Sequence, residues 1–154
     1  FVVSFDRRIL PGYAWAFPMG GGVFNVGVGV VTGAGDEAGL RAMLARFLDE
    51  TPAGRALSGA ERGRERVRGA MIRFGLAGAR PWSGGAVVAV GEAIGATYPL
   101  TGEGIGKSME TAELAADLVV DALRAGSPAP LADYPRRLDE RLWPRYRGYA
   151  LAQR

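Results

Sequence analysis

The residues best suited to chemistry lie in a glycine-rich stretch in the second half of the chain. It reads Gly-Glu-Ala-Ile-Gly from Gly91 and Gly-Glu-Gly-Ile from Gly102 to Ile105, between a predicted strand and a predicted helix. Backbone N–H groups at the start of a helix carry about half a positive charge, and glycine lets a flat ligand approach the backbone closely. Because Glu103 disfavours a phosphate there, the pattern predicts a binding loop for a ligand with a partial or delocalised negative charge.

The absence of two residue types excludes most other site chemistry. The 154 residues include no Cys and no His, which excludes zinc sites, thiol nucleophiles and acid–base catalysis by histidine. We therefore predict no metal site, and no residue is identified as catalytic. The dinucleotide fingerprint Gly-x-Gly-x-x-Gly is not completed either, since neither Gly27-x-Gly29 nor Gly102-x-Gly104 is followed by the third glycine.

The composition is that of a folded domain or of a piece of a larger protein. Hydrophobic residues make up 48% of the chain and charged residues 23%, which is the range of globular proteins. The net charge is only +3, and Lys107 is the only lysine among basic residues that are otherwise arginines. The first residue, Phe1, already reads as part of a strand, so we expect the chain to be cut out of something longer.

The alternation of side chains predicts a β-hairpin in the first part of the chain. Tyr13, Trp15 and Phe17 share one face of a strand at the two-residue period, and residues 23–31 supply the second strand. Three glycines between the strands predict a loop longer than two residues. Apolar positions at helical spacing then predict one amphipathic helix over residues 36–50.

The rest of the chain mixes predicted strands and helices. Residues 86–90 form a continuous apolar run, the pattern of a strand buried on both faces, and residues 70–74 predict a further strand. A long helix is predicted over residues 103–124, and the next helix carries Pro144, which should kink or interrupt it. These elements predict an α+β or α/β fold. The apolar stripe of the long helix comprises Ile105, Met109, Ala112, Ala116, Val119 and Leu123.

Two longer motifs occur in the chain in a fixed order. The pattern Pro-Gly-Tyr-x-Trp-x-Phe-Pro, followed by Asn-Val-Gly-x-Gly, is formed by Pro11, Gly12, Tyr13, Trp15, Phe17 and Pro18 and then by Asn25, Val26, Gly27 and Gly29. The second pattern is formed by Gly91, Ala93, Gly95, Pro99, Gly102, Glu103, Gly104 and Ile105. Both patterns resemble motifs of the geranylgeranyl reductase family, flavoproteins with the para-hydroxybenzoate hydroxylase type of FAD fold.

The resemblance implies FAD as the cofactor and gives roles to particular residues. Glu92 stands where the family has Asp, with a side chain one methylene longer, and would hydrogen-bond the ribityl chain of the flavin. The residues that would hold the cofactor are Gly91, Glu92, Pro99, Gly102, Glu103, Gly104 and Ile105, the last five along the pyrimidine edge of the ring. The residues that would line a cavity for a polyprenyl chain are Tyr13, Trp15 and Phe17.

The resemblance also implies a domain organisation. Residues 1–75 would belong to the substrate-binding and catalytic domain, with its antiparallel sheet and helix. Residues 76–125 would form the carboxyl-side part of the FAD-binding domain, and residues 126–154 a helical carboxyl-terminal segment. The amino-terminal βαβ unit that binds the ADP half of FAD is missing. The expected fold is therefore an α+β (α/β) portion of both domains, which we expect to be inactive alone.

The expected activity is the FAD-dependent reduction of isoprenoid carbon–carbon double bonds. The implied partners are a polyprenyl lipid and an electron donor, either NAD(P)H or a ferredoxin-like protein, with no nucleic acid. The expected location is cytoplasmic, with peripheral association at the membrane where prenyl lipids reside.

Two other hypotheses stay open. The first is an FAD-dependent monooxygenase, hydroxylase or halogenase-like enzyme of the same fold. The second is a non-enzymatic, arginine-rich module that binds nucleic acid or anionic membranes. Acidic residues are interleaved with the arginines of segments 62–73 and 136–147, which favours an ordinary salt-bridged surface over such a module.

Overall fold

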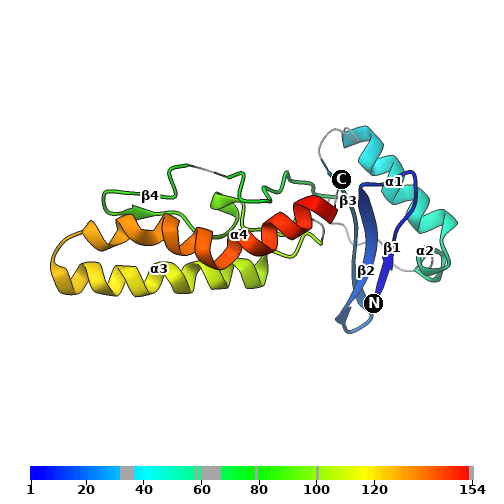
Figure 1. The fold of residues 1–154 in the computed structure, drawn as a ribbon. Helices are drawn as coiled ribbons and strands as arrows, with labels where there is room; N and C mark the ends of the chain where they lie inside the picture. The colour runs from blue at the N-terminus through cyan, green and yellow to red at the C-terminus, as the bar shows by residue number, and fades with distance from the viewer. Residues whose placement is uncertain (32–36, 58, 60–66, 79, 100, 153–154) are drawn as a thin grey trace. The chain divides into compact units, whose positions relative to one another are not determined.

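The computed structural model describes residues 1–31, 37–57, 59, 67–78, 80–99 and 101–152. The chain forms two compact units, residues 1–69 and residues 70–154 (Figure 1). The first is a small sheet with two helices, and the second contains two long helices and several short elements. No helix in the described ranges is long and apolar enough to cross a bilayer.

The first unit contains a three-stranded antiparallel sheet. Its strands β1 (Val2–Ser4), β2 (Gly12–Gly20) and β3 (Val23–Val30) lie in the order β1-β2-β3, which confirms the predicted hairpin. The connection between β2 and β3 has two residues, so the prediction of a longer loop is wrong. Gly21 and Gly22 both adopt positive φ, 57° and 77°, as a tight turn between twisted strands requires.

Two helices follow the sheet. Helix α1 (Glu37–Glu50) confirms the predicted amphipathic helix, and the short helix α2 (Pro52–Ala56) comes directly after it. Ala14 and Ala16 of β2 are buried in one cluster with Phe47 of α1. The small alanine side chains leave room for the helix on this face of the sheet. Residues 60–66, which include three of the five arginines of the first arginine-rich segment, lie outside the described residues.

The opposite face of β2 carries the aromatic side chains. Trp15 lies directly across from Gly27 of β3, and a Cβ atom on Gly27 would come within 2.2 Å of Trp15 Cζ2. The indole therefore lies against the bare backbone of β3. Its N–H donates to Asn25 Oδ1 at 2.7 Å. Glycine at position 27 is thus required by a ring that packs on it.

The second unit is organised around two helices that pack along each other (Figure 1). They are α3 (Ile105–Ala125) and α4 (Tyr134–Ala152), joined through the 3₁₀ helix η2 (Ala129–Asp133). Strands β4 (Ser83–Gly84) and β5 (Val87–Val88) form a two-residue antiparallel ladder. The core of the unit includes the buried side chains of Ile94, Leu118, Leu131, Tyr134, Leu138 and Leu142.

Two strand predictions for this unit are wrong. In segment 86–90 only Val87 and Val88 are paired, and Val87 is 69% exposed. A strand is buried on both faces where helices cover both sides of a parallel sheet, and the residues described in this unit contain no such sheet. In segment 70–74 only Phe74 is bridged, to Thr97 in parallel orientation.

Helix α3 confirms the long helix but presents the predicted stripe to solvent. Ile105, Met109 and Leu123 are 82%, 69% and 76% exposed. The side of α3 that faces the core is instead narrow and partly polar, because Thr111 and Leu118 are its most buried residues. The helix thus has an apolar stripe that the second unit leaves uncovered among the described residues.

Helix α4 continues through Pro144 instead of being interrupted there. An interior proline costs about 3 kcal/mol, and the buried side chains of Leu142 and Tyr146 on either side of it offset that cost by holding the helix on the core. On its outer surface Arg136 pairs with Asp133 and Glu140, each at 2.6 Å. This agrees with the salt-bridged surface predicted for segment 136–147.

The contact between Trp15 and Gly27 generates a stability prediction. We expect Gly27→Ala to lower the free energy of unfolding by about 1–3 kcal/mol, because the added methyl group overlaps the indole and forces it off its site. Gly29→Ala is the matched control, since its Cβ would lie at an ordinary 3.6 Å from Trp15 Cζ3. Urea denaturation monitored by tryptophan fluorescence measures both. Equal losses in the two variants would contradict the prediction.

Candidate functional site

The glycine-rich stretch begins in a buried turn that is tied to α3. Gly91 has φ 63° and opens the short 3₁₀ helix η1 (Gly91–Ile94). Its N–H donates to the hydroxyl of Thr111 at 3.0 Å, and Thr111 is fully buried. A Cβ on Gly91 would come within 2.8 Å of Ser108 Oγ. Both the backbone conformation and the packing against α3 therefore require glycine at this position.

A second strip of backbone flanks the stretch on its other side. Leu76 N–H donates to the carbonyl of Gly95 at 2.8 Å, and Gly95 itself has φ 74°. A Cβ on Gly78 would come within 2.3 Å of the carbonyl oxygen of Ala93. Segment 75–78 and segment 93–97 thus lie backbone against backbone, which fixes the path of the chain into the loop.

The loop from Tyr98 to Gly104 is closed by its own hydrogen bonds. Tyr98 N–H donates to the carbonyl of Glu103 at 2.9 Å, and Gly102 N–H donates to the carbonyl of Tyr98 at 3.0 Å. Gly102 adopts φ 68°, a conformation that favours glycine. The loop therefore holds its shape through the main chain of Tyr98.

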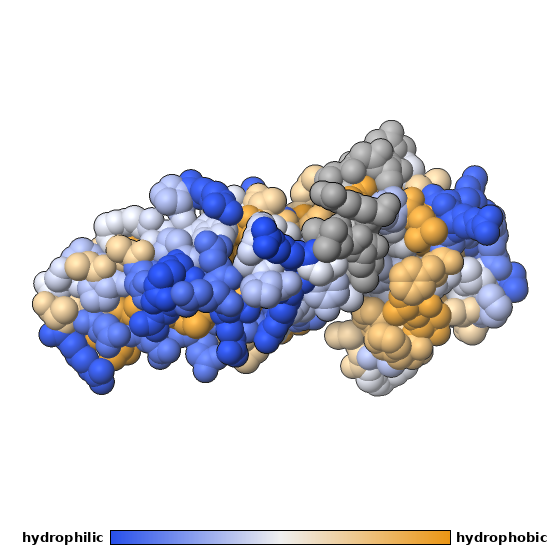
Figure 2. All heavy atoms as spheres, viewed as in Figure 1, coloured by the Kyte–Doolittle hydropathy of each residue, from blue (hydrophilic) through white to orange (hydrophobic). Residues whose placement is uncertain are grey.

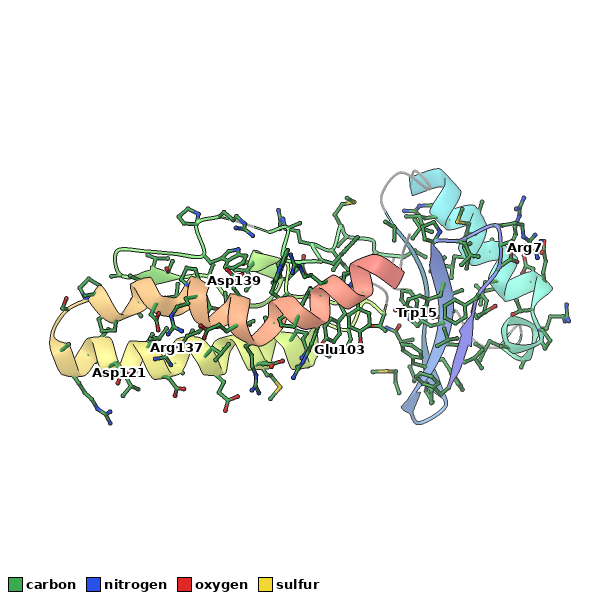
Figure 3. All side chains as sticks on the ribbon, in the orientation of Figure 1. Arg7, Trp15, Glu103, Asp121, Arg137 and Asp139 are labelled. Atoms are coloured by element: carbon green, nitrogen blue, oxygen red, sulfur yellow. The ribbon has the colours of Figure 1, made fainter. Side chains whose placement is uncertain are left out.

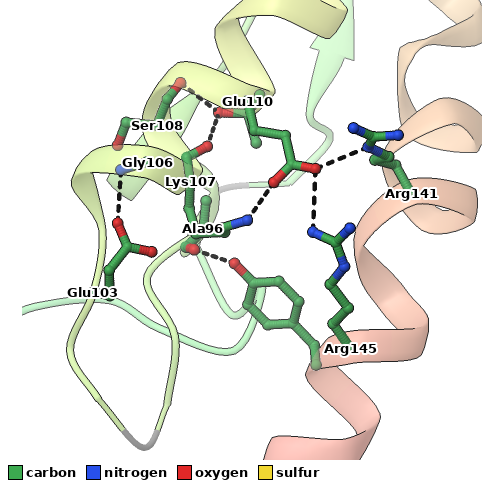
Figure 4. A network of polar contacts seen from close by, with 10 residues as sticks. Ala96, Glu103, Gly106, Lys107, Ser108, Glu110, Arg141 and Arg145 are labelled. Atoms are coloured by element: carbon green, nitrogen blue, oxygen red, sulfur yellow. Dashed lines mark hydrogen bonds and ion pairs between the residues drawn. The ribbon is translucent and has the colours of Figure 1, made fainter.

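Glu103 caps the start of α3 from outside the helix. The sequence pattern predicts Glu103 in the first turn of the helix. The helix begins at Ile105, however, so Glu103 lies two residues before it. Its carboxylate accepts the N–H of Gly106 at 2.6 Å (Figure 4). Gly104, at the N-cap position, makes no side-chain cap. The other N–H groups of the first turn are consequently left without a capping side chain in the described part of the chain.

The predicted cofactor residues divide into buried and exposed sets. Gly91 and Pro99 are buried and shape the backbone. The remaining residues of the loop are open to solvent or half-buried, and Glu103 lies beside the start of α3 (Figure 3). The accessible residues of the predicted set are Glu92, Gly102, Glu103 and Ile105, and Gly104 is half-buried.

Beside these residues lies an ion cluster that the sequence analysis missed. Glu110 of α3 accepts from Lys107 on the same helix and from Arg141 and Arg145 of α4, at 2.8 Å and 3.4 Å for the two arginines (Figure 4). The side chains of Lys107 and Glu110 are only 12% and 13% exposed. Only the spacing of Lys107 and Glu110 on one helix could have indicated part of this cluster from the sequence.

The cluster shifts the pKa values of its members. Burial raises the pKa of the Glu110 carboxyl, but hydrogen bonds from Lys107 and Arg141 outweigh burial, so the pKa lies below its ordinary value. Burial lowers the pKa of Lys107, and its bonds to Glu110 and Tyr98 outweigh that effect and raise the pKa. Both groups are therefore held in their charged forms.

The aromatic row of the first unit is longer than the three predicted residues. Tyr13, Trp15 and Phe17 follow one another with ring centroids 5.8 Å and 6.1 Å apart. Phe1 stacks on Phe17 at 4.7 Å and Phe5 contacts Tyr13 at 5.9 Å. Figure 2 shows apolar side chains gathered over β1 and β2, and Trp15 is labelled on this sheet in Figure 3. The row is a continuous aromatic surface suited to an apolar ligand.

The chemistry of these residues is that of binding and orientation. The described residues contain no group of acidic side chains that could hold a metal ion. The loop of the second unit offers backbone donors and one carboxylate cap. The sheet of the first unit offers an apolar aromatic face whose one indole N–H is already satisfied by Asn25.

Comparison with known proteins found relatives of the chain. Residues 3–60 match the geranylgeranyl reductase catalytic domain. The chain is 32% identical to menaquinone reductase of Mycolicibacterium smegmatis, over 97% of this chain and 34% of that protein. It is 34% identical to digeranylgeranylglycerophospholipid reductase 2 of Methanothermobacter thermautotrophicus, over 79% of this chain and 29% of that protein. The chain thus spans about a third of the length of these relatives.

A solved structure has the same fold. It is a geranylgeranyl bacteriochlorophyll reductase-like protein of Thermoplasma acidophilum, with a TM-score of 0.78 over 98% of this chain and 37% of that one. The sequence identity is 23%, so the likeness concerns the fold. It confirms the α+β class expected from the sequence.

The lowered pKa of Glu110 generates a prediction of pH dependence. A carboxyl group whose pKa is lower in the folded state stabilises the protein fully above its unfolded pKa, ordinarily 4.5, and loses that contribution as the pH falls through the folded value. We expect Glu110→Gln to destabilise the protein near neutral pH and to be indistinguishable from wild type in strong acid. Urea denaturation across this pH range measures the difference.

The control is Glu113→Gln, at an exposed position of the same helix that has no ion pair among the described residues. We expect its effect to be small at every pH. An equal, pH-independent loss in both variants would contradict the assignment of the pH dependence to Glu110.

Proposed function

This chain belongs to the geranylgeranyl reductase family, and on that premise we propose that the protein containing it is an FAD-dependent oxidoreductase that saturates carbon–carbon double bonds of isoprenoid lipids. The observation that supports the proposal is the stretch from Gly91 to Ile105, which resembles a flavin motif and whose described residues form a hydrogen-bonded, accessible turn before a helix start. Its relatives are named as reductases of menaquinone and of digeranylgeranylglycerophospholipid.

The loop fits a flavin ring better than a phosphate. The carboxylate of Glu103 already occupies the N–H of Gly106, and its negative charge repels a second anion. The N–H groups of Ile105 and Lys107 can still face a ring that carries only partial charge. Gly104 is required by internal packing, because a Cβ there would come within 2.8 Å of the buried Thr97 hydroxyl. When bound, FAD would supply the hydride for the reduction.

Each predicted cofactor residue has a role that matches its burial. Glu92 is exposed at the start of η1, where its carboxylate can accept hydrogen bonds from a ribityl chain. Gly91 and Pro99 are buried and set the path of the backbone. Gly102, Gly104 and the neighbouring backbone would lie along the pyrimidine edge.

We place the isoprenoid substrate against the aromatic row of the first unit. The family match covers residues 3–60 and thus includes this sheet. Tyr13, Trp15 and Phe17 present apolar ring surface, and a prenyl chain gains about 25 cal/mol for each Å² of apolar surface it buries. We also propose that NAD(P)H or a ferredoxin-like protein supplies the electrons. The protein would contact membranes peripherally.

The cofactor proposal predicts the behaviour of Glu92. We expect Glu92→Ala, in the full-length protein, to weaken FAD binding about tenfold through the loss of charge-assisted hydrogen bonds, while the free energy of unfolding stays within about 0.5 kcal/mol because the side chain is exposed. Flavin absorbance titration and urea denaturation measure the two quantities. Glu113→Ala is the matched control. A colourless wild-type protein that binds no added FAD would refute the cofactor.

The substrate proposal predicts the behaviour of Trp15. We expect Trp15→Ala to raise KM for a geranylgeranyl lipid about tenfold or more, because it removes ring surface from the centre of the row. Trp143→Ala, at a partly exposed position of α4 in the other unit, should leave KM unchanged. Mass spectrometry of the product, which gains two hydrogen atoms for each double bond, follows the reaction. Oxygen consumption with incorporation of oxygen into an aromatic substrate would select the monooxygenase alternative instead.

A further inference from the structure

We propose that helix α4 positions the glycine loop from behind, with Tyr146 and Tyr98 as the positioning residues. This inference rests on the proposed function, because the loop matters as the cofactor-binding edge. It adds Tyr146, which lies outside both sequence motifs, and Tyr98, a position within the second motif that had no role, and it assigns a functional task to the carboxyl-terminal helix.

The first contact is a buried hydrogen bond from α4 to the entrance of the loop. Tyr146 is 2% exposed, and its phenol hydroxyl donates to the carbonyl of Ala96 (Figure 4). Ala96 is itself fully buried and comes two residues before Tyr98. Burial raises the pKa of Tyr146, so the hydroxyl keeps the proton that it donates. Without this donor the carbonyl of Ala96 would lose its partner inside the core.

The second contact holds the residue that closes the loop. The main chain of Tyr98 makes both hydrogen bonds that shape the loop, to Glu103 and to Gly102. Its ring lies 5.2 Å from the ring of Tyr146 and 4.5 Å from that of Tyr149, both on α4. The position of Tyr98, and with it the shape of the loop, therefore depends on where α4 lies.

The third contact fixes α4 relative to the start of α3. Lys107 is in the first turn of α3, lies 4.9 Å from the centre of the Tyr98 ring and pairs with Glu110. Glu110 in turn binds Arg141 and Arg145 of α4. The helix start that offers N–H groups to a ligand and the helix that supports the loop are thus joined by charge-assisted bonds at low exposure.

Through these contacts α4 packs on the loop, the loop packs on the start of α3, and α3 is paired with α4. Tyr146 contacts the loop entrance from within the core. A change at this residue should nevertheless alter the position of the donors proposed to face the ligand. Removal of the Tyr146 hydroxyl should therefore change flavin binding, and not only the stability of the fold.

The test is Tyr146→Phe in the full-length protein, which keeps the ring and removes the donor. Hydrogen exchange of the FAD-free protein should become about fivefold faster or more in peptides covering residues 96–104, the factor that follows from loss of one hydrogen bond. The Kd for FAD should rise by a similar factor. The midpoint potential of bound flavin should become more negative, because the displaced donors stabilise the reduced ring less.

The matched control is Tyr134→Phe. Tyr134 is fully buried in the same unit, and its hydroxyl also donates to a backbone carbonyl, that of Thr111 at 3.2 Å. The Tyr134→Phe variant should be less stable than wild type, but hydrogen exchange in the loop should not become faster. Tyr149→Leu, at a half-buried position, gives a milder second variant that should shift exchange and Kd in the same direction as Tyr146→Phe.

The outcomes are distinguishable. Faster loop exchange in Tyr146→Phe with unchanged Kd and potential would overturn the inference, as would equal effects of Tyr146→Phe and Tyr134→Phe on the loop. A wild-type protein that binds no FAD would overturn the proposed function, and with it the flavin part of the inference. In that case the exchange comparison still shows independently whether α4 holds the loop.

Discussion

The structure of the second unit depends on one buried hydrogen bond, from the N–H of Gly91 to the hydroxyl of Thr111. A backbone donor buried without a partner costs about 1–3 kcal/mol, and Gly91 turns the chain at a positive φ where few other residues fit. The bond joins the entrance of the glycine-rich stretch to the second turn of α3. The loop can then return to the start of the same helix, so a single helix anchors both ends of the candidate site.

The two units use glycine in different ways. The sheet of the first unit uses Gly27 on β3 to make room for an indole, and Asn25 satisfies that indole's only polar atom. The second unit uses glycines to bring backbone against backbone, as at Gly78 and Gly95. In both units glycine is needed because something else occupies the space of a side chain. The indole of the first unit and the backbone turns of the second are thereby fixed next to solvent-accessible surface.

Features with a local cause could be predicted from the sequence. Alternation at period two places Tyr13, Trp15 and Phe17 on one face, and the confirmed hairpin follows from it. Helical spacing predicts α1, α3 and α4 for the same reason. The apolar run at residues 86–90 misled because a short apolar segment has no periodicity that distinguishes a central strand from a loop beside a core. The predicted apolar stripe on α3 was wrong about burial, because the spacing of apolar residues does not reveal which side of a helix the rest of the unit covers.

Features that join distant segments could not be predicted. The hydroxyl of Tyr146 meets the carbonyl of Ala96 fifty positions earlier, and Glu110 meets Arg141. No spacing rule connects such positions, because the pairing depends on how α4 packs on α3. The position of Glu103 just outside the helix also needed the structure, since the boundary of a helix is the part of it that sequence patterns define least well.

Lys107 gives the ion cluster an unusual chemical property. It is the only lysine of the chain, and its amine is largely shielded by Glu110 and the ring of Tyr98. Acylating reagents attack the neutral amine, a form that the raised pKa makes scarce in the folded protein. Side-chain acylation of this chain is therefore slow while the cluster is closed and becomes fast when it opens, so one covalent label reports whether the helix pair is intact.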